Sequence, residues 1–212
     1  RDVLGSRGLG DVYKRQLRHV DNIQNVYGLP CVVAINRFPT DTEAELALIE
    51  SECQKLGVNV KLSEVWAKGG EGALELADEV MRLIEQPSEL KFAYEDGADV
   101  ADALDAVATK VYRADGVDFT PAAKRQLAEL RENGFGNLPV CVAKTQYSFS
   151  DNAKALGAPE NFRITVRELK VSAGAHFVVA LTGSVLTMPG LPKVPAAENI
   201  DVDNDGNITG LF

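Results

Sequence analysis

Cysteine, histidine and tryptophan are scarce in this sequence, and their scarcity excludes several kinds of site. The 212 residues include three cysteines, two histidines and one tryptophan. Cys31, Cys53 and Cys141 show no Cys-x-x-Cys spacing, so we interpret them as reduced core residues and expect no disulfide framework. His19 and His176 are too few for a zinc site or a Ser-His-Asp centre. We therefore expect no metal site, and we interpret His176 as a partly buried, neutral residue at the start of a strand.

Basic residues and long apolar runs are also few. Lysine and arginine number 22 against 31 aspartates and glutamates, which gives a net charge of −9 and a pI of about 4.8. Such a chain offers no basic patch to nucleic acid or to an anionic membrane, so we expect neither as a partner. No apolar run approaches a membrane span, and no signal peptide is visible. With 45% hydrophobic residues there is enough core for one large or two small domains, and we expect a cytoplasmic protein.

A phosphate-binding loop of the G-x-x-x-x-G-K-[ST] type is absent, because no glycine is followed directly by lysine. The glycines at positions 5, 8 and 10 do not fit G-x-G-x-x-G either. A glycine-rich stretch, KGGEG at residues 68–72, leads into a predicted helix and could hold an anion through its backbone N–H groups. Taken alone, this stretch is weak evidence for ligand contact, since an ordinary turn has the same composition.

One stretch near the N-terminus has the pattern of a β-α-β unit. An apolar run over residues 30–35 predicts a strand buried on both faces, and residues 58–62 predict a second strand. Between them, Thr40 and Glu43 form a capping box at the start of a helix that ends at Gly57. One face of this helix is apolar, at Leu46, Ile49, Cys53 and Leu56. The pattern predicts two parallel strands joined by a right-handed crossover.

Aromatic side chains follow both predicted strands. Phe38 lies just past the first strand and Trp66, the single tryptophan, lies past the second. Because ligands of open α/β sheets bind at the carboxyl ends of the strands, two rings there can clamp a flat heterocycle. Stacking of this kind is worth roughly 1–3 kcal/mol per ring, by analogy with nucleobases. The alternative is that both rings are core or lid residues, and strand geometry alone does not separate the two interpretations.

The same unit is similar to the base-reading half of a P-loop GTPase. In those proteins an apolar strand ends in Asn-Lys-x-Asp, and a later strand ends in a Ser-Ala-Lys loop. Here NRFP (residues 36–39) and WAK (residues 66–68) stand at these places. Pro39 replaces the aspartate that accepts hydrogen bonds from guanine, so we do not expect a GTPase-like nucleotide binder. Our hypothesis is that an ancestral base pocket became a stacking pocket for another flat ring.

Helices dominate the next part of the sequence. The first of them has an apolar stripe made of Leu74, Ala77, Met81 and Ile84, widened by Leu76, Val80 and Leu83. Pro87 ends this helix, and an extended segment over residues 90–95 marks a soft domain boundary. Two more helices are predicted, one over residues 100–111 and one that begins with Thr120 as N-cap and Pro121 at its first position.

Three further strands are predicted in the C-terminal part. Residues 138–144 and 177–182 have the apolar composition of buried strands, and residues 162–167 alternate as a half-exposed strand. Polar side chains after the first of these strands are candidate donors to an anionic or nucleotide group, namely Lys144, Gln146 and Ser148. Hydrogen bonding within the loop explains them equally well, and we assign them no catalytic role.

Two acidic patterns imitate metal sites, and we prefer another explanation for each. Aspartates recur every three residues over residues 96–105, which is typical of a solvated helix face. The segment DVDNDGN imitates an EF-hand loop, but Phe212 stands where a bidentate glutamate is needed. We predict a β-hairpin there, in which Ile200 and Val202 pair with Ile208 around an Asn/Asp-Gly turn.

Four longer phrases make the chain similar to a known family. They are NIQNVYGLPCVVAINRFPTDT, EVWAKGGEG, CVAKTQYSFSDNAKALGAP, and SAGAHFVVALTG with MPGLPKVPAAENIDVDNDGNITGLF. In this order, over residues 17–212, they resemble the C-terminal part of formate–tetrahydrofolate ligase. Residues 1–16, RDVLGSRGLGDVYKRQ, match nothing in that family and resemble a translated adaptor sequence. We expect this segment to be non-native, and disordered or loosely packed.

The resemblance implies a reaction and a site. The family joins formate to tetrahydrofolate with ATP and Mg²⁺, through formyl phosphate, and a monovalent cation is a further candidate requirement. The phenylalanine and tryptophan of its motifs line the pterin pocket, which assigns Phe38 and Trp66 to that pocket, with Leu62 on the approach. Candidate loop contacts are Asn36, Lys68, Gly69, Gly70, Lys144, Gln146 and Ser148.

The resemblance also implies a family chain more than twice this length, with the phosphate loop in an N-terminal half that would be this fragment's partner. We expect the fragment to bind folate, to hold no cofactor tightly and to be inactive alone. We expect the complete enzyme to be a homo-oligomer. The alternative is a non-catalytic α/β binding or scaffold module with filled pockets.

The predicted fold class is α/β. Residues 17–90 are expected to form a parallel-strand, P-loop-NTPase-like unit that lacks its phosphate loop and carries the folate pocket. Residues 91–212 are expected to form a smaller C-terminal α+β region, and residues 1–16 a tail.

Overall fold

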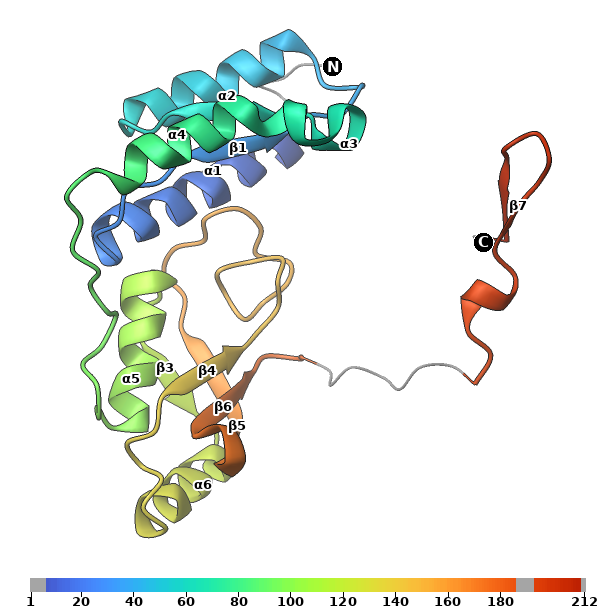
Figure 1. The fold of residues 1–212 in the computed structure, drawn as a ribbon. Helices are drawn as coiled ribbons and strands as arrows, with labels where there is room; N and C mark the ends of the chain where they lie inside the picture. Colours follow the sequence, from blue (N-terminus) through green and yellow to red (C-terminus); the bar gives the residue numbers. More distant parts are fainter. Residues whose placement is uncertain (1–6, 186–192, 211–212) are drawn as a thin grey trace.

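The structure, a computed structural model, describes residues 7–185 and 193–210 and has two lobes (Figure 1). The N-terminal lobe contains α1 (Arg7–Asp21), the π-helical turn η1 (Asn22–Val26), β1 (Val33–Asn36), α2 (Glu43–Lys55), β2 (Val60–Ser63), α3 (Val65–Lys68), the 3₁₀ turn η2 (Gly69–Ala73) and α4 (Leu74–Ile84). The C-terminal lobe contains α5 (Val100–Ala106), the π-helical turn η3 (Val107–Val111), β3 (Val117–Phe119), α6 (Pro121–Glu132), β4 (Val140–Ala143), β5 (Ile164–Ser172), the 3₁₀ turn η4 (Ala173–Ala175) and β6 (Phe177–Thr182). The 3₁₀ turn η5 (Ala196–Glu198) and the short strands β7 (Asp201–Val202) and β8 (Ile208–Thr209) follow. No helix in these described ranges is long and apolar enough to cross a membrane.

The predicted β-α-β unit is present. β1 and β2 pair in parallel, from Val33 opposite Val60 to Asn36 opposite Ser63, and α2 connects them. The prediction that the first strand is buried on both faces is wrong, because Ala34 and Asn36 are exposed. Within the described part of the chain β2 is the one strand that pairs with β1, and α4 packs beside β2. The face of β1 that carries Ala34 and Asn36 therefore stays uncovered.

The predicted helix start is displaced by two residues. α2 has Thr42 as its N-cap, with the Thr42 hydroxyl accepting from the Glu45 N–H at 3.3 Å and the Glu45 carboxylate accepting from the Thr42 N–H at 2.9 Å. This is a capping box, but it uses the second Thr-x-x-Glu of the segment and not the pair that begins at Thr40. The end at Gly57 is confirmed, since Gly57 has φ +70° and its N–H donates to the Gln54 carbonyl at 2.9 Å.

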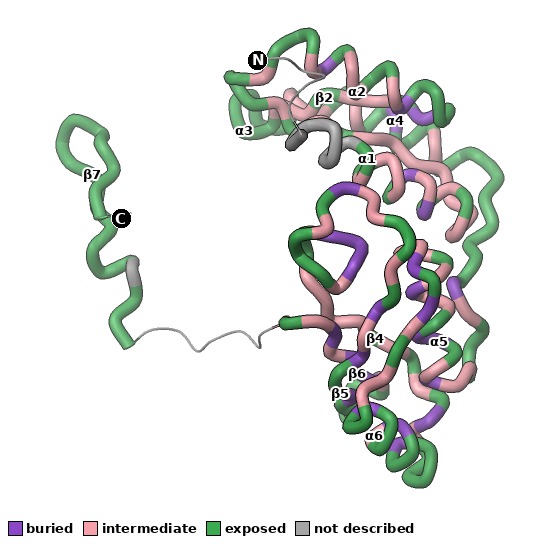
Figure 2. Tube along the Cα trace, turned by 180° about the vertical axis from the view of Figure 1, so that it is seen from behind, coloured by how far each residue is buried: buried purple, intermediate pink, exposed green. Residues whose placement is uncertain are grey.

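Helix α1 corrects the expectation of a disordered tail. It begins at Arg7, so the residues from 7 to 16 are helical, whereas residues 1–6 lie outside the described residues. Its C-terminal half packs on the sheet, where Val20 forms a core cluster with Cys53 of α2 and Val58 before β2. The core of this lobe is small, and Figure 2 shows few buried positions there compared with the C-terminal lobe.

The C-terminal lobe is built on a mixed four-stranded sheet. The strand order is β3-β5-β6-β4, with β3–β5 and β6–β4 parallel and β5–β6 antiparallel. Both α5 and α6 contribute to one core cluster with inward residues of β5 and β6, so the helices cover one face of the sheet. This mixed architecture with parallel strand pairs agrees with the predicted α/β class.

Because helices cover only one face of this sheet, two predictions made from the sequence are wrong. Residues 177–182 were predicted as a fully buried strand, but in β6 buried positions alternate with half-buried ones. Cys141 was predicted as a core residue of a buried strand, but it is exposed. It lies on β4 between Val140 and Val142, which pack toward the helices, so its side chain falls on the other face.

The apolar stripe predicted for residues 74–84 forms a helix but does not face the lobe. Leu74, Met81 and Ile84 are all more than half exposed, and the buried position of α4 is Glu79. The Glu79 carboxylate accepts hydrogen bonds from Asn59 Nδ2 at 2.9 Å and from Arg82 Nη2 at 2.5 Å. Polar contacts therefore determine which side of α4 packs on the sheet.

The two lobes meet where two π-helical turns face each other. Asn22 of η1 donates from Nδ2 to the carbonyl of Val111 in η3 at 2.9 Å, and Arg113 forms an ion pair with Asp21. The Oδ1 atom of Asn22 is buried and accepts no hydrogen bond. Since π turns are rare and often mark functional places, a pair of them in contact defines the junction.

Phe149 is the apolar centre of this junction. Its side chain is buried, and its ring lies 4.8 Å from the His19 ring and 6.4 Å from the Tyr112 ring, measured between centroids. The Arg18 guanidinium lies over the same ring at 5.4 Å. The Phe149 side chain thus connects α1, the C-terminal end of η3 and the loop after β4.

The C-terminal acidic segment forms the predicted hairpin. Val202 pairs with Ile208 and Asp201 with Thr209, which confirms the Val202 pairing, whereas Ile200 lies outside the strand. The Asp203 carboxylate accepts from the N–H groups of Asp205 and Asn207 at 2.9 and 2.8 Å. Asp203 is therefore used by the turn itself.

Candidate functional site

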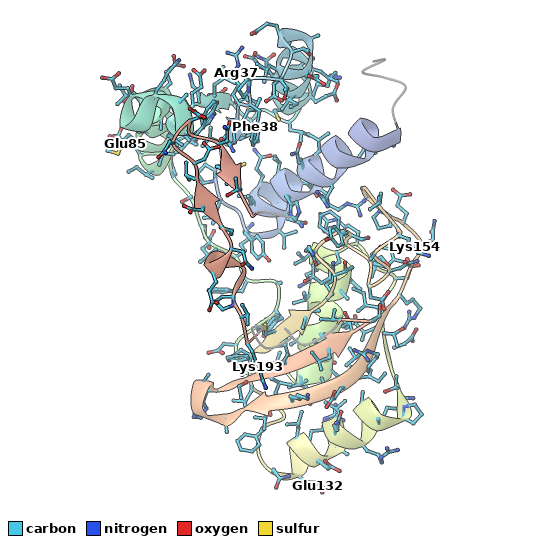
Figure 3. All side chains as sticks on the ribbon, turned by 90° about the vertical axis from the view of Figure 1, so that its right-hand side faces the viewer. Arg37, Phe38, Glu85, Glu132, Lys154 and Lys193 are labelled. Carbon is cyan, nitrogen blue, oxygen red and sulfur yellow. The ribbon has the colours of Figure 1, made fainter. Side chains whose placement is uncertain are left out.

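A tight turn presents Phe38 at the carboxyl end of β1. The Asp41 N–H donates to the Phe38 carbonyl at 3.0 Å, and the Phe38 N–H donates to Asp41 Oδ2 at 2.8 Å. Pro39 fits the second position of such a turn because its φ is already restricted. The Phe38 side chain, next to Arg37 in Figure 3, is 57% exposed, so it is not a core residue.

Trp66 lies at the neighbouring strand end, in the short helix α3. Its Nε1–H donates to the carbonyl of Arg37 at 2.8 Å, which ties α3 to the residue just before Phe38. The indole is 60% exposed. Both predicted rings are therefore at the same edge of the sheet, and both present apolar surface to solvent.

The glycine-rich stretch is fastened to the end of β2. The Glu64 N–H donates to the Gly72 carbonyl at 3.0 Å, and a Cβ added at Gly72 would lie 2.5 Å from the Glu64 carbonyl carbon. At Gly69 and Gly70 an added Cβ would meet nothing within 4 Å. Lys68, at the end of α3, reaches back to Glu64 with Nζ 2.5 Å from Oε2.

A cavity of about 610 Å³ adjoins this edge, which is within the usual size of a small-molecule site. Of the predicted site residues, Leu62 and Lys68 line it, together with Gly72 of the glycine-rich stretch. Phe38, Trp66 and Asn36 are not among its lining residues. Asn36 is the exposed last residue of β1. The rings thus lie at the strand ends, whereas the cavity extends along β2 between α2 and α4.

Carboxylates dominate the cavity, and this feature was not predicted from the sequence. Five glutamates line it against two lysines, Lys61 and Lys68; the glutamates are Glu43, Glu50, Glu64, Glu71 and Glu75. The hydrogen bond from Lys68, more than any other contact, lowers the pKa of Glu64. A signal was present in the sequence, since Glu43 and Glu75 are in the first turns of predicted helices, where acidic residues are usually explained as favourable to the helix dipole.

The site does not fit a nucleotide phosphate. The hydrogen bond from the Glu64 N–H to the Gly72 carbonyl fixes the end of the 68–72 stretch beside β2. Two residues that line the cavity near this bond, Glu64 and Glu71, are acidic. A phosphate loop needs converging N–H groups with a lysine, and here Lys68 is paired with a carboxylate. We therefore derive no phosphoryl chemistry from these residues.

The second group of predicted contacts lies in the C-terminal lobe. Lys144 donates from Nζ to the carbonyls of Thr145 and Ser148 and lies 5.1 Å from the Tyr112 ring centroid. Burial lowers its pKa to about 8. Ser148 is buried and donates to the carbonyl of Ala155, whereas Gln146 is exposed. Two of these three side chains are thus used within their own loop.

Helix α1 separates the two groups. It packs on the sheet through Val20, and Arg15 on α1 donates to the carbonyl of Tyr147 in the loop after β4 at 3.2 Å. The loop and the sheet lie on different sides of this helix (Figure 1). The structure therefore groups Phe38, Leu62, Trp66 and Lys68 and leaves Lys144, Gln146 and Ser148 elsewhere.

Comparison with protein families gives a match over nearly the whole chain. A family model described as formate–tetrahydrofolate ligase matches residues 8–212. The expectation that residues 1–16 are foreign to the family is therefore wrong for residues 8–16, which lie within the match.

Proposed function

This chain belongs to the formate–tetrahydrofolate ligase family, and from that premise we propose that its N-terminal lobe supplies the pterin-binding side of the ligase. The proposal takes Phe38 and Trp66 as the two rings that grip the pterin, with Leu62 on the approach. The observation that carries it is the bond from Trp66 Nε1 to the Arg37 carbonyl. That bond holds one ring beside the turn that presents the other, and both rings are more than half exposed.

The acidic cavity supports the same direction of binding. A reduced pterin carries several N–H donors on its ring, and carboxylates are acceptors for such donors. The glutamate tail of a folate is anionic and would be repelled by the five glutamates of the cavity. We therefore place the pterin ring at this edge and the tail toward solvent.

The proposal leaves ATP and Mg²⁺ to residues outside this sequence. The 212 residues contain no phosphate loop, and the glycine-rich stretch does not fit a phosphate. Catalysis of phosphoryl transfer depends on positioning and charge neutralisation of the phosphates. We expect the isolated chain to bind tetrahydrofolate weakly and to show no ATP-dependent formylation; measured turnover by the purified chain would contradict this.

The kinship with P-loop NTPases belongs to the same proposal. The parallel crossover from β1 to β2, with its ligand side chains at both carboxyl ends, supports a base-reading unit modified for a pterin. A scaffold module with filled pockets is the alternative, and it is disfavoured because the cavity beside Leu62 is open, at about 610 Å³.

Trp66 provides a direct test, since it is the single tryptophan and its fluorescence reports one position. Tetrahydrofolate should quench this emission in the 212-residue chain as the pterin stacks. Phe38→Ala should weaken the binding by roughly 1–3 kcal/mol, and so should Trp66→Ala when binding is followed by calorimetry.

Phe92→Ala is the matched control, because Phe92 is 76% exposed and lies in the segment between the lobes. It removes an exposed ring of the same kind from another place and should leave the affinity unchanged. An affinity that is the same in the Phe38 and Trp66 variants as in the parent would remove the basis of the pocket.

A further inference from the structure

Arg37 is connected to three elements of the N-terminal lobe through its backbone and its side chain. Its N–H donates to the Ser63 carbonyl at the end of β2 at 3.0 Å, and its carbonyl accepts from Trp66 Nε1 of α3 at 2.8 Å. Its guanidinium donates from Nη2 to Glu43 Oε1 at 2.6 Å, and Glu43 is the first residue of α2. The residue that precedes Phe38 is therefore fixed to β2, to α3 and to α2.

The ion pair between Arg37 and Glu43 closes the loop that carries Phe38, because these two residues stand at its two ends. Inside the loop, the two hydrogen bonds between Phe38 and Asp41 close a tight turn. The Phe38 ring is 57% exposed, so packing on the lobe contributes little to its direction. The direction of the ring therefore depends on the backbone of this turn, whose two ends the ion pair holds together.

The charge of Arg37 also acts on the neighbouring strand end. The pKa of Glu64 is lowered first by the hydrogen bond from Lys68, and to a smaller extent by the positive charges of Lys68 and Arg37. Glu64 and Glu43 both line the cavity. The Arg37 guanidinium thus interacts with two carboxylates of the cavity wall, one on α2 and one just after β2.

The exposure of the ion pair limits what it can do. The side chains of Arg37 and Glu43 are 31% and 82% exposed. A pair of this kind contributes little to the stability of a fold, because water and salt screen it. It can still restrict a loop in advance, and a ligand that binds a preordered ring does not lose free energy in ordering it. The effect of the pair is therefore expected in ligand affinity and not in the free energy of unfolding.

We propose that Arg37 is a positioning residue of the pterin pocket, whose guanidinium holds Phe38 in its binding direction by closing the loop between β1 and α2 onto Glu43. This inference rests on the proposed function, since it takes Phe38 and Trp66 as the rings that grip the pterin. The Arg37 side chain makes no contact with the ligand in this proposal and acts through Phe38.

A double-mutant cycle in the 212-residue chain tests the proposal by calorimetry. The ligand is 6-methyltetrahydropterin, a reduced pterin without the anionic tail, so the charge changes cannot act on a tail. Arg37→Gln and Glu43→Gln should each weaken binding about threefold to tenfold, which corresponds to the ordering of one side chain. The double variant should bind no more weakly than either single variant, because both changes break the same pair. Arg37→Lys should recover most of the loss, since the contact uses one N–H group and not a bidentate fork.

Two further measurements separate positioning from a general structural effect. In a Phe38→Ala background, Arg37→Gln should cause no further loss of affinity, because the ring that it positions is absent. Urea unfolding should give Arg37→Gln and Glu43→Gln nearly the parental free energy of unfolding. Lys55→Gln is the matched control, since it removes an exposed ion pair with Glu52 at the other end of α2, and it should bind the pterin as the parent does.

Trp66→Ala shows which of the two proposals a negative result contradicts. If Trp66→Ala weakens binding and Arg37→Gln does not, the ring pocket stands and the role of Arg37 is wrong. If Trp66→Ala binds as the parent does, the pocket itself is contradicted, and the role of Arg37 with it. Additive losses in the cycle, an undiminished loss from Arg37→Gln in the Phe38→Ala background, or a large loss of stability in Arg37→Gln would each overturn the role of Arg37.

Discussion

Glu79 shows at the scale of one residue how α4 is attached. Its carboxylate accepts from Arg82 Nε at 3.0 Å, from Arg82 Nη2 at 2.5 Å and from Asn59 Nδ2 at 2.9 Å. The hydrogen bonds from Arg82, followed by the one from Asn59, lower the pKa of Glu79 from 4.5 to about 2. Because the folded state favours the ionised form, this contribution to stability is present above the unfolded pKa and is lost as the pH falls toward about 2.

Replacing Glu79 should therefore flatten the acid side of the stability curve. Between about pH 5 and pH 2, the free energy of unfolding of the parent should fall more steeply than that of Glu79→Gln. Urea unfolding at several pH values measures both slopes. Glu75→Gln, at a carboxylate that is 82% exposed, is the control and should keep the parental slope. Identical slopes for the parent and Glu79→Gln would contradict the assignment.

Residue identity alone does not reveal the role of Glu79 in the sequence. It lies on the polar side of a helix with a wide apolar stripe, and such a pattern predicts that the glutamate faces water. Its partner Asn59 is 20 positions away, in the segment before β2. Periodicity reports which residues share a face, and only the packing of the whole lobe decides which face is inward.

At the scale of the element, the start of α2 has two possible N-caps in the sequence. Thr40 and Thr42 are each followed three residues later by a glutamate. Thr42→Ala should cost about 1 kcal/mol of stability, since it removes the N-cap, whereas Thr40→Ala should cost close to nothing. Denaturant unfolding of the two variants decides, and an equal loss from both would show that the cap is shared.

The sequence could predict a capping box but not which one forms. The turn closed by Asp41 and Phe38 already occupies Thr40, so the helix can begin only after it. That turn is held by a side-chain contact within NRFPTD, a local effect that helical periodicity does not include. The strands, the parallel crossover and the helix end at Gly57 were predictable because each rests on a single local signal.

The end of the glycine-rich stretch gives a second prediction for an element. Gly72→Ala would place its Cβ 2.5 Å from the carbonyl carbon and 2.6 Å from the carbonyl oxygen of Glu64, so the backbone must shift. We expect a loss of roughly 1–3 kcal/mol in unfolding free energy and weaker tetrahydrofolate binding. Gly70→Ala, at a position with open space around it, is the matched control and should change neither quantity. A fully stable Gly72→Ala would argue against the close approach.

For the whole molecule, Phe149 is the residue whose removal tests whether the lobes are coupled. It is buried among His19, Tyr112 and Arg18 at the junction. Phe149→Ala should destabilise the chain by about 3–5 kcal/mol, as is typical for a buried phenylalanine. It should also increase proteolytic cleavage in the segment between α4 and α5. Tyr147→Ala, at an exposed ring in the same loop, should do neither.

The arrangement of the lobes was beyond prediction from the sequence. The sequence predicts a soft boundary near residues 90–95, and the structure has no helix or strand between α4 and α5 there. The contact between the loop after β4 and α1 could not be predicted, because it joins Arg15 to Tyr147, 132 positions apart. For the same reason the sequence could not tell whether Lys144 and Ser148, predicted as candidate loop contacts, lie near the two rings; in the structure they lie on the other side of α1.

The two π-helical turns at the junction have a consequence for chain length. A π turn accommodates one residue more than the α turn that it replaces. Deleting one residue from η1 or from η3 would restore an α turn and swing the rest of the chain by about 100° around that helix axis. Relatives whose length differs within residues 22–26 or 107–111 would then hold their two halves at a different mutual angle.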